Sequence, residues 1–467
     1  MNRIIVSLLA SLILVLWGLG TSANPIFIID MCLWICMMIS AYSNIERNYL
    51  EFAFGLAFFT FLMGREFLEQ YSLHSVEKDF PKSINFHLYI CILISLISFW
   101  MAFSFFNKKR NTNTSEKKTG CTAYYKTVRK YAKLIFLLSM PFAFISTLIM
   151  SAIVFTVGYQ NSYLVVSVLM ENFPVLYVFD KIGIMMPTCF CIYSATLPDR
   201  RDFYKIGKIY LFYSFLTVFE GARGTFLINI LVFGAILAYF QCMRPNEKWF
   251  DKQRYARWAM IGVPLVMIAS VAIKVGRNGD DWRKMDMTEA ITDFVYQQGV
   301  TGLNLKRAYE IESSIPEPVS GFYSLEFLHS GLPARLLGNK VYSGYNVEHA
   351  LEGNSMKFAL AYATMGTEFL EGQGTGSSFI IETFYDFGYI GIALGSILYA
   401  FLFSLLHRTS RDNLLGKSLA FTIIGSILWA TRAGFTDFLQ HLLAPTILFV
   451  IAFIFILAHR KKHVVSV

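Results

Sequence analysis

Long apolar runs recur along almost the whole chain and are separated by short polar segments. A run of about 20 apolar residues is long enough to cross a membrane as a helix, so the pattern predicts about twelve spans. Their approximate ranges are 4–20, 25–41, 50–64, 86–106, 134–157, 180–197, 206–221, 225–242, 258–275, 378–406, 416–432 and 439–458. A transmembrane β-barrel would show short segments of alternating polarity instead, and none is visible. The pattern therefore predicts an all-α, polytopic integral membrane protein.

The polar segments indicate how the chain is oriented. Strongly basic stretches occupy 107–133, 199–208, 243–257 and 459–463. All of them fall on one side of the membrane if the N-terminus is cytoplasmic, which is the side where Lys and Arg accumulate. An even number of spans then places both termini in the cytoplasm. The formal net charge of +9 is explained by this topology, with anionic lipid headgroups as counterions, and needs no nucleic-acid partner.

The first residues have two readings. Residues 1–23 have a basic start, an apolar run and small residues, which is the arrangement of a secretory signal. The alternative is an uncleaved first membrane helix, which we favour because further spans follow. Both readings give the same topology downstream.

One long loop divides the chain into three parts. Residues 1–275 hold spans one to nine, 276–377 form an extracytoplasmic loop, and 378–467 hold spans ten to twelve. A loop of this length is usually functional or disordered, and its many aromatic residues argue against disorder. Apolar residues recur at helical spacing in 287–298 and 355–370. We therefore expect a folded cap with amphipathic helices on the outer membrane surface.

The cysteines imply neither a disulfide framework nor a metal site. Seven are present, at positions 32, 36, 91, 121, 189, 191 and 242. Cys32 and Cys36 are one helical turn apart, and Cys189 and Cys191 flank Phe190, but no further His or Cys lies at metal-ligand spacing. Helix packing is the better explanation, and we expect no metal and no cofactor.

Three arginines lie at the predicted outer ends of different spans. Arg223 belongs to the stretch EGARG, which joins spans seven and eight, Arg277 follows span nine, and Arg432 ends span eleven. Charged side chains near membrane depth cost about 2.5–3.5 kcal/mol and often mark functional sites. The planar guanidinium binds phosphate oxygens in bidentate fashion, so the three could hold one polyanion. Alternatively, each arginine reaches the lipid headgroups, and Glu220 pairs with Arg223 to cap a hairpin.

Carboxylates and histidines accompany the arginines on the same side. The acidic residues are Asp280, Asp281, Glu368, Glu382 and Asp386, and the histidines are His329 and His349. Such groups can act as bases near neutral pH. His329 has Arg335 nearby, although loop histidines are most often solvated.

The stretch GQGTGSSFIIETFYDFGYIGIALG at 372–395 carries a resemblance to a known family. Together with the GARG turn and the long late loop, it resembles the Wzy-type oligosaccharide repeat-unit polymerases. The matching positions are Gly374, Gly376, Ser377, Ser378, Glu382, Tyr385, Phe387, Gly388 and Gly391. The resemblance is one of layout over most of the chain, with two short motifs.

The resemblance implies a metal-independent membrane glycosyltransferase similar to the GT-C superfamily, on the outer face of the bacterial inner membrane. Such an enzyme moves a growing glycan from undecaprenyl pyrophosphate onto a fresh lipid-linked repeat, and a chain-length regulator is a further partner to consider. Its leaving group is a polyanion, which arginines would stabilise. The implied catalytic residues are Arg223, Arg277, Asp280, His329 and Glu382, and the implied substrate-binding residues are Arg432, Glu220, Arg335, Tyr385 and Asp386.

Two other functions share parts of this layout. A lipid-linked oligosaccharide flippase also has about twelve spans, but it would carry charges at mid-span and short loops. This sequence shows few mid-span charges and one large loop, which favours an enzyme. An O-antigen ligase shares the architecture and the donor, so the sequence does not separate it from a polymerase.

Overall fold

The computed structural model describes residues 3–108, 123–249, 287–319, 321–409 and 413–464, together with 251, 253 and 257. These residues form helices joined by turns, with no strand among them. The all-α prediction is therefore confirmed for this part of the chain.

Seven segments of the described residues are long and apolar enough to cross a membrane. They are α1 (Arg3–Gly20), α2 (Pro25–Ser43), α5 (Lys82–Lys108), α6 (Ala123–Val157), α8 with α9 (Pro174–Gly183 and Met185–Ala195), α11 (Arg223–Met243) and α19 (Phe379–Thr409). Two shorter apolar helices, α20 (Leu414–Trp429) and α22 (Pro445–Val464), follow α19. The predicted span 258–275 lies outside the described residues, so the number twelve stays a prediction.

Two predicted spans take a different form. The third predicted span consists of three consecutive helical segments, which are α3 (Ile45–Phe58), the π-helical η1 (Phe59–Met63) and α4 (Gly64–Gln70). The seventh is α10 (Arg200–Leu216), which ends earlier than the predicted residue 221. It ends there because Thr217 Oγ1 donates to Ser214 O at 2.7 Å and Gly221 adopts a φ of 84°, which turns the chain toward α11.

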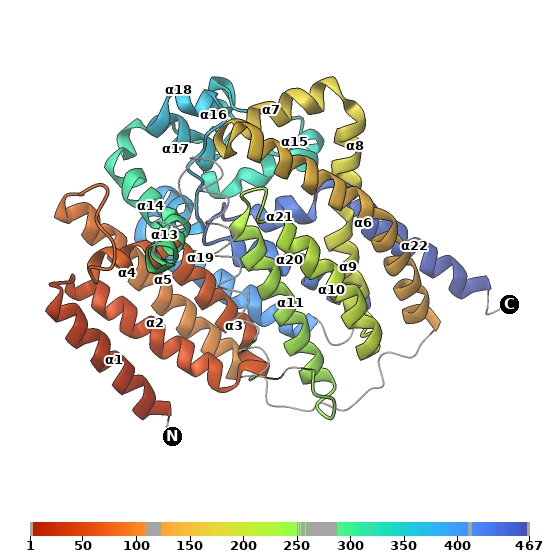
Figure 1. Cartoon of the computed structure of the whole chain (residues 1–467), viewed down its shortest axis with the longest axis horizontal. Helices are drawn as coiled ribbons and strands as arrows, with labels where there is room; N and C mark the ends of the chain where they lie inside the picture. The colour runs from red at the N-terminus through yellow and green to blue at the C-terminus, as the bar shows by residue number, and fades with distance from the viewer. Residues whose placement is uncertain are drawn as a thin grey trace.

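Short helices form the long loop and gather at one end of the bundle. They are α13 (Met287–Gln298), α14 (Val300–Glu310), η3 (Glu312–Ser314), η4 (Tyr323–His329), α15 (Gly331–Leu336), α16 (Val347–Glu352), α17 (Met356–Met365) and α18 (Thr367–Leu370). Helices α15 to α18 lie in the upper part of Figure 1, which we call the loop end. The helix expected at 287–298 is present, whereas the one expected at 355–370 breaks at Gly366, whose φ is 59°.

The first loop helices pack tightly against membrane helices, while their place on the outer membrane surface stays a prediction. A Cβ on Gly299 would lie 2.5 Å from the backbone nitrogen of Arg65, and one on Gly302 would lie 2.5 Å from Leu62 O. Only glycine permits so close an approach of two backbones. The turn between α13 and α14 therefore packs directly against η1 and α4.

Buried ion pairs hold these loop helices in place. Lys306 of α14 pairs with Glu66, which also accepts a 3.1 Å hydrogen bond from Tyr89 Oη. Arg65 binds Glu69 at 3.2 Å, and its Nη2 donates to Tyr296 Oη of α13 at 2.6 Å. Burial makes such pairs costly to break singly, so they tie the loop to the membrane helices.

Further charged side chains of the helical bundle are buried, among them Asp30 in α2, Glu51 in α3 and Lys417 in α20. Asp30 and Lys417 lie near the starts of their helices. The expectation of few mid-span charges stays a prediction.

Candidate functional site

A tight turn at the loop end joins α20 to α21 (Asp437–Leu442), and other elements converge on it. Phe379 N at the start of α19 donates to Ala430 O at 3.0 Å. Phe435 N donates to Glu382 Oε2 at 2.7 Å, and Thr436 Oγ1 donates to Ser324 O of η4 at 3.0 Å. The turn therefore sits where two membrane helices meet the loop.

Arg432 projects from this turn against aromatic rings. Its guanidinium carbon lies 5.5 Å from the ring centre of Phe61 and 5.8 Å from that of Trp429. Its Nη1 donates to Oε1 of Gln298, at the end of α13, at 3.2 Å. Aromatic faces and an amide oxygen thus contact the cation.

The EGARG stretch meets the same pair of rings. A Cβ on Gly224 would collide with the Trp429 ring and would lie 3.4 Å from Phe61. The two rings contact each other edge to face, with centroids 5.2 Å apart. The start of α11, which is Arg223, and the turn that carries Arg432 are therefore adjacent.

One predicted arginine and two predicted acids are not placed by the structure. Arg277 and Asp280 lie outside the described residues, as does Asp281. The structure therefore brings together the elements carrying Arg223 and Arg432, while convergence of all three arginines stays a prediction.

Glu220 faces α6 and α8. Burial raises the pKa of its carboxyl to about 7, a hydrogen bond with Thr147 of α6 lowers it, and the charge of Asp180 of α8 raises it. Asp180 in turn accepts a 3.4 Å hydrogen bond from Ser146 Oγ. Glu220 therefore changes its charge near neutral pH.

Three carboxylates and one lysine cluster beside Arg432. Glu382 of α19 and Glu326 of η4 are 0% and 4% exposed, and Asp437 opens α21. Lys357 of α17 binds Glu326 Oε1 at 3.3 Å, and the charge of Glu326 raises the pKa of Lys357. Burial raises the pKa of Asp437 to about 6, although Lys357 opposes that rise.

One oxygen of each carboxylate has no hydrogen-bond partner among the described residues. These atoms are Glu326 Oε2, Glu382 Oε1 and Asp437 Oδ1. A Cβ on Gly434 would lie 2.8 Å from Asp437 Oδ1 and 2.9 Å from Glu382 Oε1. Two unpartnered carboxyl oxygens therefore face the same glycine.

Two predicted substrate-binding residues attach the loop to α19. Asp386 accepts hydrogen bonds from Tyr323 N and Ser324 N, both at 2.8 Å. Tyr385 Oη donates to Ile315 O at 3.2 Å. These contacts orient η4, so they place Glu326 in the carboxylate cluster.

The remaining predicted residues lie further along the loop. His329 is half-buried at the end of η4, where burial lowers the pKa of its imidazole. Arg335 is exposed on the neighbouring α15. Among the described residues, neither side chain forms a hydrogen bond or an ion pair with the turn that carries Arg432.

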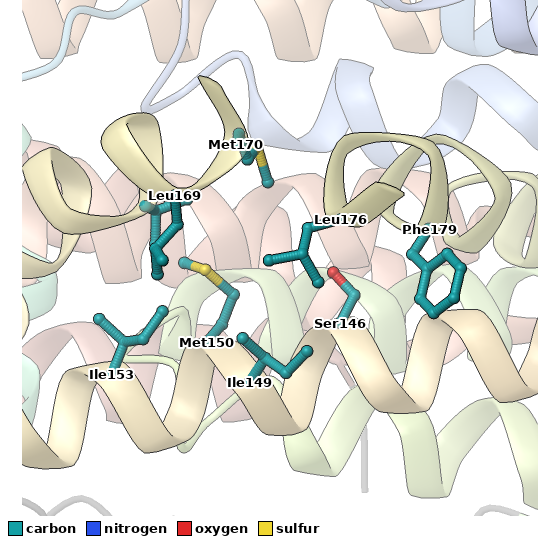
Figure 2. A pocket seen from close by; sticks show the side chains of 9 residues that line it. Ser146, Ile149, Met150, Ile153, Leu169, Met170, Leu176 and Phe179 are labelled. Atoms are coloured by element: carbon teal, nitrogen blue, oxygen red, sulfur yellow. The ribbon is translucent and has the colours of Figure 1, made fainter. Parts of the chain in front are cut away.

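A pocket of about 340 Å³ lies between α6 and the pair α7 (Tyr159–Asn172) and α8. Figure 2 shows Ile149, Met150 and Ile153 pointing from α6 toward Leu169 and Leu176. Ser146 is its only polar lining residue within the described part of the chain. The pocket provides apolar walls but no charged group, so the chemistry is assigned to the turn instead.

Metal-ligand geometry is not found within the described ranges, which hold no group of three or more His, Cys, Asp or Glu able to hold an ion. The six cysteines described, all but Cys121, form no disulfide with one another.

Sequence reasoning assigned no role to Glu326, Lys357, Gln298 or Asp437. The available signal was weak: Lys357 is the one charged residue of α17, a helix of otherwise apolar or small residues. A lysine in such a helix needs a buried acidic partner. The identity of that partner depends on the fold.

A family model described as "O-antigen polysaccharide polymerase Wzy" matches residues 2–463, nearly the whole chain. No curated protein and no solved structure matches it.

Proposed function

The chain belongs to the Wzy family of O-antigen polysaccharide polymerases, and from this premise we propose how it acts. It transfers a growing glycan from undecaprenyl pyrophosphate to the sugar hydroxyl of a lipid-linked repeat unit. The family confirms the resemblance noted at 372–395 and a membrane role in polysaccharide biosynthesis. The donor, the acceptor and the positions of the groups that act on them belong to the proposal.

The adjacency of Arg432 and the EGARG turn carries this proposal. The leaving group of the transfer is a lipid pyrophosphate, whose charge grows as the bond to the sugar breaks. Arg432 and Arg223 would stabilise that charge, and fixed donors aimed at developing charge are worth several kcal/mol in such sites. Arg277 is a third cation of the proposal. With arginines in this role, the reaction would need no metal ion.

The loop would supply the acceptor side of the site. Its helix η4 joins the turn through Thr436 and Ser324, so a glycan bound by the loop would lie near Arg432. Glu382, Asp280 and His329 are the groups that could take the proton of the acceptor hydroxyl. Of these, Glu382 touches the turn directly.

The proposed orientation places the loop end on the outer face of the inner membrane and both termini in the cytoplasm. The basic starts of α6 and α10 and the basic segment after α11 support it, since these helix ends lie away from the loop end. A cysteine placed at exposed Leu336 should react with a membrane-impermeant thiol reagent in intact cells whose outer membrane has been permeabilised.

The function is tested in a deletion strain by reading the glycans on a gel. Loss of a polymerase leaves single repeats, whereas loss of a ligase leaves unattached long chains and loss of a flippase leaves repeats on the cytoplasmic side. Lipid-linked repeats extracted from the deletion strain should then form ladders with the purified protein in proteoliposomes, also in the presence of EDTA. Ladders that require a divalent cation would contradict the metal-independent mechanism.

Arg223→Ala tests the cation assigned to EGARG. It should abolish the ladder, whereas Arg201→Ala, an exposed arginine at the start of α10 and away from the loop end, should not. Full-length ladders from Arg223→Ala at normal protein level would exclude Arg223 from the site.

A further inference from the structure

The carboxylate cluster has fewer positive charges than negative ones. Glu326, Glu382 and Asp437 face a single lysine, and Lys357 is already paired with Glu326. A buried carboxylate without a partner is costly, and two neighbouring carboxyls avoid that cost by sharing a proton. Glu382 and Asp437 are therefore the two groups left to share one.

One oxygen of each of these two groups lies beside the same glycine. Glu382 is completely buried, and its Oε2 is held by the Phe435 backbone amide. Its other oxygen, Oε1, and Asp437 Oδ1 both face the side of Gly434 that has no side chain. Neither oxygen has a hydrogen-bond partner among the described residues, so a proton between them would satisfy both. Asp437 is the less buried member and so the one that an acceptor could reach.

We propose that Glu382 and Asp437 form a carboxyl pair that receives the proton of the acceptor hydroxyl, with Lys357 and Glu326 as positioning residues. This inference rests on the proposed polymerase function and names its proton acceptor. Asp437 is the charged member of the pair, and Glu382 carries the proton that it shares with Asp437.

The transfer balances with these groups alone. The acceptor oxygen forms a bond to the anomeric carbon of the donor glycan as the bond from that carbon to the phosphate oxygen breaks. The electron pair of the broken bond leaves with the lipid pyrophosphate. The hydroxyl proton passes to Asp437, which releases it to water before the next cycle.

Within the described residues, charged groups on neighbouring elements set the proton affinity of Asp437. Burial raises its pKa, Lys357 of α17 lowers it, and Glu326 of η4 raises it. Glu382 shares its proton, and Tyr399 of α19 donates to Phe435 O at 2.7 Å in the same turn. His441 lies on α21 itself, where burial keeps its pKa low and its imidazole neutral.

The pH profile of polymerisation tests the pair. The rate in proteoliposomes, with extracted lipid-linked repeats as substrate, should fall below about pH 6, where Asp437 gains a proton. Lys357→Gln should move this acid limb up by roughly one pH unit, because a nearby positive charge is lost. Glu326→Gln should move it down, since a negative charge is lost and Lys357 is released toward Asp437.

The double variant Lys357→Gln/Glu326→Gln keeps the test valid if a single variant is unstable. The upward shift from Lys357→Gln and the downward shift from Glu326→Gln should cancel, so the rate should fall at about the same acidic pH as in the wild type. Lys340→Gln is the matched control, since Lys340 forms an exposed pair with Glu348 on the same loop and should move nothing. Asp437→Asn should lose activity by roughly 100-fold or more at every pH, the usual contribution of a positioned base.

Three results would overturn the proposal. One is an acid limb that neither Lys357→Gln nor Glu326→Gln moves, and another is an Asp437→Asn protein that polymerises within about threefold of the wild-type rate. The third is a wild-type protein that forms no ladder, which would overturn the polymerase function as well. The first two leave that function intact, so the two failures are distinguishable.

Discussion

The backbone amide of Phe435 donates a 2.7 Å hydrogen bond to Oε2 of Glu382. This bond joins the turn after α20 to the first turn of α19. The two segments are far apart in sequence, because most of α19 and all of α20 lie between them. Arg432 lies three residues before Phe435 on the same turn. The bond therefore joins the element that carries the proposed leaving-group site to α19, which carries Glu382.

Arg432 should be the most sensitive cation of the described site. Arg432→Ala is expected to lower the polymerisation rate by roughly 100-fold or more, as removal of one fixed donor does elsewhere. Arg432→Lys keeps the charge but loses the planar fork, so we expect a partial loss of roughly tenfold. Gln298→Ala should cost less than either, because the guanidinium remains. Equal rates for Arg432→Ala and Gln298→Ala would remove Arg432 from the site.

Gly434→Ala should disrupt the carboxyl pair without removing a charge. The new methyl group would lie 2.8 Å from Asp437 Oδ1 and 2.9 Å from Glu382 Oε1, so the carboxyls must separate. We expect a loss of roughly tenfold or more in ladder formation, as misplacement of a reacting group causes. Gly374→Ala is the control, because its methyl would meet only Tyr345, at an ordinary 3.8 Å.

Glu220 should make thermal stability depend on pH. Its pKa is raised to about 7 by burial, so the folded protein binds this proton more tightly than the unfolded chain does. Stability therefore falls as pH rises from about 4.5 through 7. Glu220→Gln should reduce the fall in melting temperature between pH 5 and pH 8 by roughly 2–4 °C, measured by intrinsic fluorescence in detergent.

Glu368→Gln serves as the control for this measurement, since Glu368 is exposed on α18. It should leave the pH dependence of melting unchanged. If Glu220→Gln melts with the same pH dependence as the wild type, the carboxyl does not titrate in this range.

The Lys306–Glu66 pair should anchor the loop to the bundle. Lys306→Met leaves a buried carboxylate unpaired, a change that typically costs about 3–5 kcal/mol. We expect a lower melting temperature and faster proteolysis of the loop, and Lys306→Met/Glu66→Gln should recover part of the loss. Lys340→Gln, which breaks an exposed pair, should change neither. An unchanged melting temperature in Lys306→Met would show that the pair does not anchor the loop.

Much of this protein follows from local sequence. Hydropathy is a property of consecutive residues, so the apolar runs predicted helices at the places where α1, α2, α5, α11 and α19 are found. The motif at 372–395 is also contiguous, and it pointed to the family that the whole chain matches. Arg223, Arg432 and Glu382 could be named because each interrupts or ends an apolar run.

Tertiary structure decided which of these residues act together. Glu326, Lys357, Glu382 and Asp437 come from four elements, η4, α17, α19 and α21, and no spacing in the sequence relates them. The close packing of α13 and α14 against η1 and α4 is also set by tertiary structure, since it depends on backbones that meet at Gly299 and Gly302. Burial and pairing arise only when distant segments pack. The sequence therefore determined the class, the helices and the candidate cations, while the shared turn and its carboxyl pair came from the fold.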